Sequence, residues 1–141
     1  MPIKPENKHR YPVNWKQIRA AILERAGHAC ENCRLPNGSH IVRGAGESAD
    51  TFMDMDGYVF DADDGTRLGR VRHSDYEGVG KWVKIVLTIA HLDHIPENCD
   101  PANLRAWCQR CHLRYDTAHH AETARETRRK KLNNLELFPA L

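Results

Sequence analysis

The sequence predicts a small α+β domain with a structural zinc knuckle and an inserted β-rich loop region. Two Cys-x-x-Cys pairs, Cys30/Cys33 and Cys108/Cys111, supply four thiol ligands. A β-branched run over residues 82–89 leads directly into a cluster of histidine and aspartate. Helical spacing of apolar residues is found before the first cysteine pair, and a further helix is expected after the second. A chain of 141 residues fits one domain with a modest core, which bound metal would reinforce.

Residues 1–13 contain three prolines and are predicted to form a flexible N-terminal arm. A helix is expected over residues 14–26, with Asn14 as its N-cap and Gly27 ending it. Residues 36–80 hold most of the nine glycines and are expected to form an insertion that loops out, with short strands at 57–60 and 70–72.

The run 82–89 is the clearest strand of the chain, because it is long and rich in β-branched residues. After Cys111 we expect a helix to about Leu132, broken or restarted near residues 117–120. Residues 14–135 are therefore assigned to one domain with the insertion at about 36–80, and residues 136–141 to a C-terminal tail.

Composition excludes several classes of protein. No run of 18 apolar residues is present, so no membrane span is predicted, and the first residues lack the apolar core of a secretory signal. An intracellular, reducing location and zinc ligation therefore explain the cysteines better than disulfides do. The formal net charge is only +2, but basic residues gather near the C-terminus.

Two Cys-x-x-Cys pairs on turns are the usual way to build a closed four-thiolate zinc site. Cys33 and Cys108 are separated by 74 residues. That gap is compatible with one site because the cost of loop closure grows slowly with loop length. We expect Zn²⁺ at the four cysteines and regard Cys99 as a bystander in a loop.

The stretch Ile89–His112 combines imidazole, carboxylate and amide groups within 24 residues. Hydrolysis of a phosphodiester needs a base for water, a cation for the developing charge and a group that orients the base. Histidine suits the first role, since its ordinary pKa is near neutral. Histidine and carboxylate suit the second, and an Asn side chain can hold a loop.

The chain contains the element Asn103-Leu104, and His112 follows Asn103 by nine positions, at the end of Cys-Gln-Arg-Cys-His. This pattern resembles the HNH nuclease family. The resemblance covers Ile89–Asp116 closely and Trp15–Cys33 loosely. It implies a ββα-metal fold and a DNA endonuclease that uses Mg²⁺ or Mn²⁺. In that family a hairpin carries the base, a loop carries the Asn and a helix carries a metal-binding His. It also implies a bacterial or phage setting, with DNA-packaging or mobile-element partners.

The register of the first motif stays open between two histidines. If His94 is the general base, Asp93 precedes it as a metal ligand, but the loop to Asn103 is short. If His91 is the base, the spacing to Asn103 fits, but Ala90 occupies the ligand position. We favour His91, with His94 auxiliary and Asp93 as the metal carboxylate in either case.

His112 and Asp116 are four residues apart on the expected helix, so both could bind the same catalytic ion. Basic residues could contact DNA phosphates, although a solvated helix face explains a charge run equally well. The candidate phosphate contacts are Arg105, Arg110, Arg114, Arg128, Arg129, Lys130 and Lys131. The main alternative is a non-catalytic, zinc-stabilised DNA-binding module, which Ala90 favours. Nothing in the sequence indicates an oligomeric state or a base-reading motif.

Overall fold

The computed structural model describes residues 3–137, and of residues 120, 123 and 133–137 it describes the backbone only. Helix α1 (Trp15–Arg25) comes first, followed by five strands that form one antiparallel sheet, a two-stranded hairpin and helix α2 (Gln109–Leu137). The five strands are β1 (His40–Gly44), β2 (Thr51–Asp54), β3 (Tyr58–Asp61), β4 (Arg67–Arg70) and β5 (Gly78–Lys84). The hairpin consists of β6 (Thr88–His91) and β7 (Leu104–Trp107). Short 3-10 turns occupy Pro5–Arg10, Gly46–Ser48, His73–Asp75 and Pro101–Asn103.

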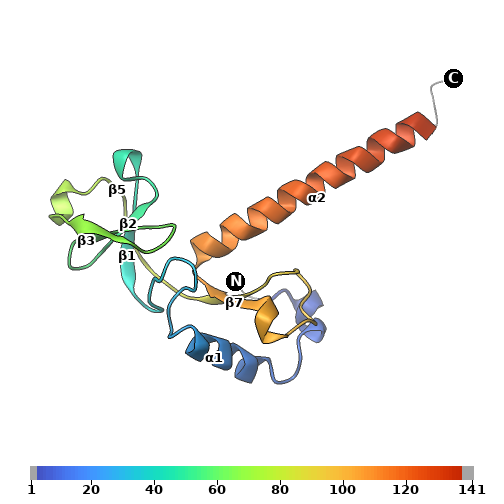
Figure 1. Cartoon of the computed structure of the whole chain (residues 1–141), viewed down its shortest axis with the longest axis horizontal. Helices are drawn as coiled ribbons and strands as arrows, with labels where there is room; N and C mark the ends of the chain where they lie inside the picture. The colour runs from blue at the N-terminus through green and yellow to red at the C-terminus, as the bar shows by residue number, and fades with distance from the viewer. Residues whose placement is uncertain (1–2, 138–141) are drawn as a thin grey trace.

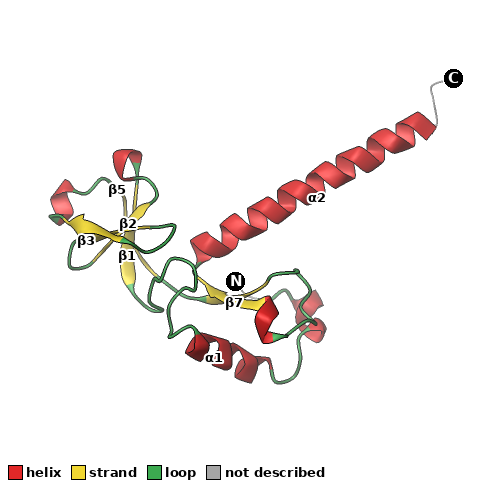
Figure 2. Ribbon diagram, viewed as in Figure 1, coloured by secondary structure: helices red, strands yellow, loops and turns green. Residues whose placement is uncertain are grey.

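The five-stranded sheet has the order β4-β3-β2-β1-β5, and the hairpin is a separate sheet. Figure 1 shows the sheet and the hairpin on either side of the point where α2 begins, with α2 extending away from both. Figure 2 shows that β7 leads almost directly into α2, so that two strands and a helix follow one another. The fold is therefore mixed α+β, as the sequence predicts.

The run 82–89 is not one strand. Residues up to Lys84 pair with β1 in the large sheet, whereas Thr88 begins the hairpin. The chain changes sheet between them because the turn after the first cysteine pair holds the linking residues. The Ile85 N–H donates to the Ser39 carbonyl, and the Leu87 N–H donates to the Asn37 side chain.

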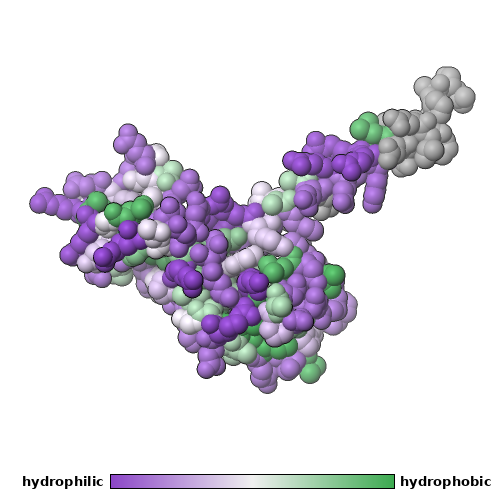
Figure 3. Space-filling view, in the orientation of Figure 1, coloured by the Kyte–Doolittle hydropathy of each residue, from purple (hydrophilic) through white to green (hydrophobic). Residues whose placement is uncertain are grey.

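Both helices differ in detail from the prediction. Helix α1 is confirmed, but Asn14 makes no side-chain cap hydrogen bond, and Gly27 adopts a left-handed φ of 67° just beyond the end. The predicted break near residues 117–120 is wrong, since α2 is continuous through this segment. Helix α2 is largely hydrophilic where it projects from the body (Figure 3), as expected for a solvated helix. The expected tail begins inside α2, and its residues 138–141 lie outside the described range.

The N-terminal segment is not a free arm. Residues Pro5–Arg10 form a 3-10 helix, and the Arg10 guanidinium pairs with the Glu97 carboxylate at 2.5 Å. Tyr11 packs its ring edge-on against Trp15, with centroids 5.0 Å apart. These contacts fasten residues 5–11 beside the hairpin.

One hydrophobic core joins all parts of the domain. It includes Ile22 and Leu23 of α1, Leu104 of β7, and Ile41 and Phe52 of the large sheet. The four cysteines belong to the same cluster. The expectation that residues 36–80 loop out is therefore wrong: this insertion forms a sheet whose inner face completes the core. Among the described residues, no helix has both the length and the apolar character needed to cross a bilayer.

Candidate metal centre and catalytic cluster

The two cysteine pairs meet in space, as predicted. The Sγ atoms of Cys30, Cys33, Cys108 and Cys111 all lie within 4.8 Å of one another, and all four residues are buried. The Cys33 and Cys108 sulfurs are 3.6 Å apart, far longer than a disulfide bond of about 2.05 Å. Four sulfurs at about 2.3 Å from a tetrahedral zinc would be roughly 3.8 Å apart. The cluster could therefore hold a metal ion such as zinc.

Local structure positions the thiols of this cluster. The Cys30 N–H donates to the Leu35 carbonyl, which closes the turn of the first pair. Cys108 directly follows β7, and Cys111 lies in the first turn of α2. Hydrogen bonds among the four thiols lower the pKa of Cys108 and raise the pKa values of Cys33 and Cys111, so the four thiols share their protons unequally.

His91 ends β6 and is half-buried among aromatic rings. Its imidazole stacks on Trp15 with centroids 5.3 Å apart and meets Tyr11 edge-on at 5.8 Å. Its Nε2 lies 3.9 Å from the Cys99 sulfur. Burial lowers the pKa of His91, so the ring is neutral at pH 7 and has a lone pair for a proton. Cys99 lies outside the four-cysteine cluster, in agreement with its expected bystander role there.

Asp93 does not join the groups on α2. Its Oδ1 accepts from the Asn103 side chain at 2.9 Å and from the Ile95 N–H at 2.9 Å, and its Oδ2 accepts from Asn98 at 2.7 Å. These bonds lower the pKa of Asp93 to about 2, the Asn98 bond most of all. Asn103 also accepts from the Asp93 N–H. The pair Asp93–Asn103 therefore fastens the loop between the hairpin strands, and these contacts engage the Asp93 carboxylate within the loop rather than with His112 or Asp116.

His94 instead turns toward α2. Its Nε2 lies 3.1 Å from Asp116 Oδ1, and the other carboxylate oxygen lies 3.4 Å from His112 Nε2. His94 adopts a left-handed φ of 59°, which is uncommon for a residue with a side chain and often marks a functional position. Its ring also stacks on His119 with centroids 3.7 Å apart. Asp116 thus connects one histidine of the loop with one of the helix.

Thr88 fixes the orientation of His112. The Thr88 hydroxyl lies 2.8 Å from His112 Nδ1 and donates to the Trp107 carbonyl at 3.4 Å. The hydroxyl thus engages Nδ1, which leaves Nε2 on the side of Asp116, 3.4 Å from its carboxylate. Burial also lowers the pKa of His112, which keeps the ring neutral. Sequence reasoning missed Thr88, although its place two residues before Ala90 on the same strand face was a usable signal.

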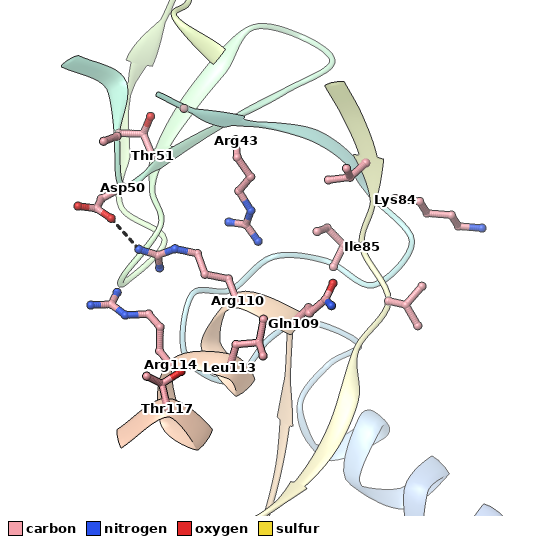
Figure 4. A pocket seen from close by; sticks show the side chains of 14 residues that line it. Arg43, Asp50, Thr51, Lys84, Ile85, Gln109, Arg110, Leu113, Arg114 and Thr117 are labelled. Atoms are coloured by element: carbon pink, nitrogen blue, oxygen red, sulfur yellow. Dashed lines mark hydrogen bonds and ion pairs between the residues drawn. The ribbon is translucent and has the colours of Figure 1, made fainter. Parts of the chain in front are cut away.

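The predicted phosphate contacts divide into two groups. Arg105 donates to backbone carbonyls of Ala102 and Leu104, and Arg110 donates to Asp50, Asp63 and the Ala62 carbonyl. Arg114 also pairs with Asp63. These three arginines thus serve internal contacts, and Figure 4 shows the Arg110–Asp50 pair at the edge of a cavity of about 760 Å³. The second group is exposed on α2 and comprises Arg128, Arg129, Lys130 and Lys131.

The chain matches no protein-family model, no curated protein and no solved structure.

Proposed function

We propose that this protein is a metal-dependent DNA endonuclease of the HNH type, which hydrolyses phosphodiester bonds. The observation that carries the proposal is the arrangement of His112, whose Nδ1 is engaged by Thr88 and whose Nε2 faces Asp116. A histidine whose second ring nitrogen is held by a hydrogen-bond partner is typical of a metal ligand. His94 approaches the same carboxylate from the loop, and His91 ends the strand just before that loop.

His94, His112 and Asp116 offer imidazole and carboxylate groups, the donor types of a divalent-ion site. Among the described residues, only the four cysteines already bring three or more ligand atoms within 4.8 Å of one another, so the histidines and Asp116 would close around the ion on binding. Two imidazoles and one carboxylate suit Mn²⁺ better than Mg²⁺, which prefers oxygen ligands and bound water. Ala90 is buried, and its methyl group has no atom that could bind a metal. His94 would take this ligand role instead. When bound, the ion would supply positive charge to the scissile phosphate and the leaving oxygen.

His91 is the residue we assign as general base. Its ring is neutral at pH 7 because burial lowers its pKa, so it can accept a proton from the attacking water. Stacking on Trp15 and the edge-on contact with Tyr11 keep the ring in one orientation. Asn103 acts at a distance, because with Asp93 it holds the loop that carries His94.

The remaining assignments follow from the same reasoning. We propose Zn²⁺ as the structural ion at the four cysteines, because four thiolates form a closed tetrahedral site. DNA is the proposed partner, with Arg128, Arg129, Lys130 and Lys131 as contacts to its phosphates. The family resemblance supports action inside a bacterial cell, with phage or mobile-element partners.

Binding of Mn²⁺, followed by electron paramagnetic resonance, tests the site separately from catalysis. His112→Ala, Asp116→Ala and His94→Ala should each weaken Mn²⁺ binding, whereas His91→Gln should retain it and lose cleavage. Loss of a general base is expected to slow cleavage by about 10²-fold or more. His40→Ala serves as the control, since His40 is exposed on β1. If His94→Ala binds Mn²⁺ like the wild type and loses cleavage, while His91→Gln remains active, then His94 is the base.

A non-catalytic DNA-binding module is the alternative function, and Ala90 is the observation that favours it. In that case the protein would bind DNA but would cut none with any divalent ion. His91, His94 and Asp116 could then be replaced without any effect on DNA affinity.

A further inference from the structure

Arg43 reaches from the large sheet to the cysteine cluster. It lies on β1, opposite Phe52 of β2, and its guanidinium stands over the Phe52 ring at 5.7 Å from the centroid. Its Nη2 lies 3.9 Å from the Cys108 sulfur. Figure 4 shows the side chain extending from β1 toward the start of α2, where Cys108 and Cys111 are found.

The second terminal nitrogen of Arg43 has no hydrogen-bond partner. Among the side chains that the structure describes, its Nη1 is the only buried nitrogen or oxygen atom in this condition. Arg43 as a whole is half-buried, but a buried charged nitrogen without a partner is costly, so a neighbouring charge is expected. Nη1 itself is closed off from the solvent of the cavity that Arg43 lines. Nη2 approaches the Cys108 sulfur, so the cysteine cluster is the neighbouring group that can supply the negative charge.

A divalent ion bound by four thiolates provides such a charge, since the assembly carries a formal charge of −2 in a low-dielectric core. The guanidinium is always protonated and therefore compensates part of this charge at every accessible pH. We propose that Arg43 is a positioning residue of the metal centre: it offsets the negative charge of the metal–thiolate cluster, and the inserted sheet thereby contributes to metal retention.

The inference rests on the proposed zinc and is independent of nuclease activity. Asn32 makes a related contact from the turn of the first cysteine pair, since its side chain donates to the Cys111 sulfur at 3.3 Å. It is neutral, whereas Arg43 brings a full charge. Removal of a group that contacts a metal ligand commonly weakens metal binding by about 10- to 100-fold.

Zinc affinity of the full-length protein, measured by chelator competition, tests the proposal. Arg43→Met removes the charge but keeps most of the side-chain length, and Arg43→Lys keeps the charge. Lys84→Met is the matched control, because Lys84 is an exposed cation that lines the same cavity. We expect Arg43→Met to bind zinc about 10- to 100-fold more weakly, Arg43→Lys to recover most of the affinity, and Lys84→Met to equal the wild type.

Substitution of Co²⁺ for zinc gives a readout that general loosening of the sheet would not change. The sulfur-to-cobalt charge-transfer band should shift in Arg43→Met and return toward its wild-type position in Arg43→Lys. Equal zinc affinity and an unshifted band in Arg43→Met would overturn the proposal. Equally weak binding by Arg43→Met and Arg43→Lys would also overturn it, because packing would then explain the effect. A wild-type protein without stoichiometric zinc would instead refute the zinc assignment itself.

Discussion

Phe52→Ala tests whether the inserted sheet shares its core with the metal centre. Phe52 is 4% exposed, stacks on Phe60 at 5.1 Å and packs in the cluster that contains the four cysteines. Removal of a buried Phe side chain costs about 3–5 kcal/mol. With a slope of about 2 kcal/mol per molar urea for a domain of this size, the unfolding midpoint should fall by roughly 1.5–2.5 M.

Urea unfolding can be followed separately in the two halves of the molecule. Trp82 reports on β5, so a Trp82→Phe background leaves Trp15 and Trp107 to report on α1 and the hairpin. We expect these two tryptophans and zinc release to shift together when Phe52 is truncated. Val79→Ala is the control, since Val79 is 58% exposed on β5 and should change stability by no more than about 0.5 kcal/mol. If Phe52→Ala leaves the transition reported by Trp15 and Trp107 unchanged in the Trp82→Phe background, the insertion is a separate folding unit.

Two further predictions concern the proposed activity. Because burial lowers the pKa of His91, the base is already unprotonated at neutral pH. The cleavage rate at saturating Mn²⁺ should therefore rise with pH through an apparent pKa below the ordinary value of about 6.5 and then level off; a rise centred above that value would contradict the assignment. Log affinity for DNA falls as log salt rises, and neutralising the basic run on α2 should make this fall less steep. The slope should decrease in magnitude by about 0.9 for each DNA phosphate that the protein no longer neutralises. An unchanged slope would identify the run as a solvated helix face. The residues to be replaced are Arg128, Arg129, Lys130 and Lys131.

The sequence contained enough information to predict the cysteine cluster. Two Cys-x-x-Cys pairs in one chain are typical of a single four-thiolate site, so Cys30 and Cys33 were expected to meet Cys108 and Cys111. Helix α1 was also predictable, because its apolar spacing and Gly27 mark its extent.

Other features depend on contacts that no local pattern records. The run 82–89 has no glycine or proline to show where the chain leaves one sheet for the other. The role of the insertion depends on Phe52 and Ile41 belonging to the same core cluster as Leu104 of the hairpin. Asp93 was predicted to be a metal ligand because carboxylates bind metals. Its hydrogen bonds with Asn98 and Asn103 are contacts within the folded loop, and no local sequence pattern indicates them.

Nicking of supercoiled plasmid DNA by purified protein tests the central claim most directly. The wild type should convert plasmid to nicked or linear products with Mn²⁺ and should be inactive with a chelator. His112→Ala and His91→Gln should cleave about 10²-fold or more slowly while retaining zinc, and His40→Ala should cut like the wild type. Absence of cleavage with every divalent ion, or equal cleavage by all the variants, would contradict the assignment of this cluster as a nuclease site.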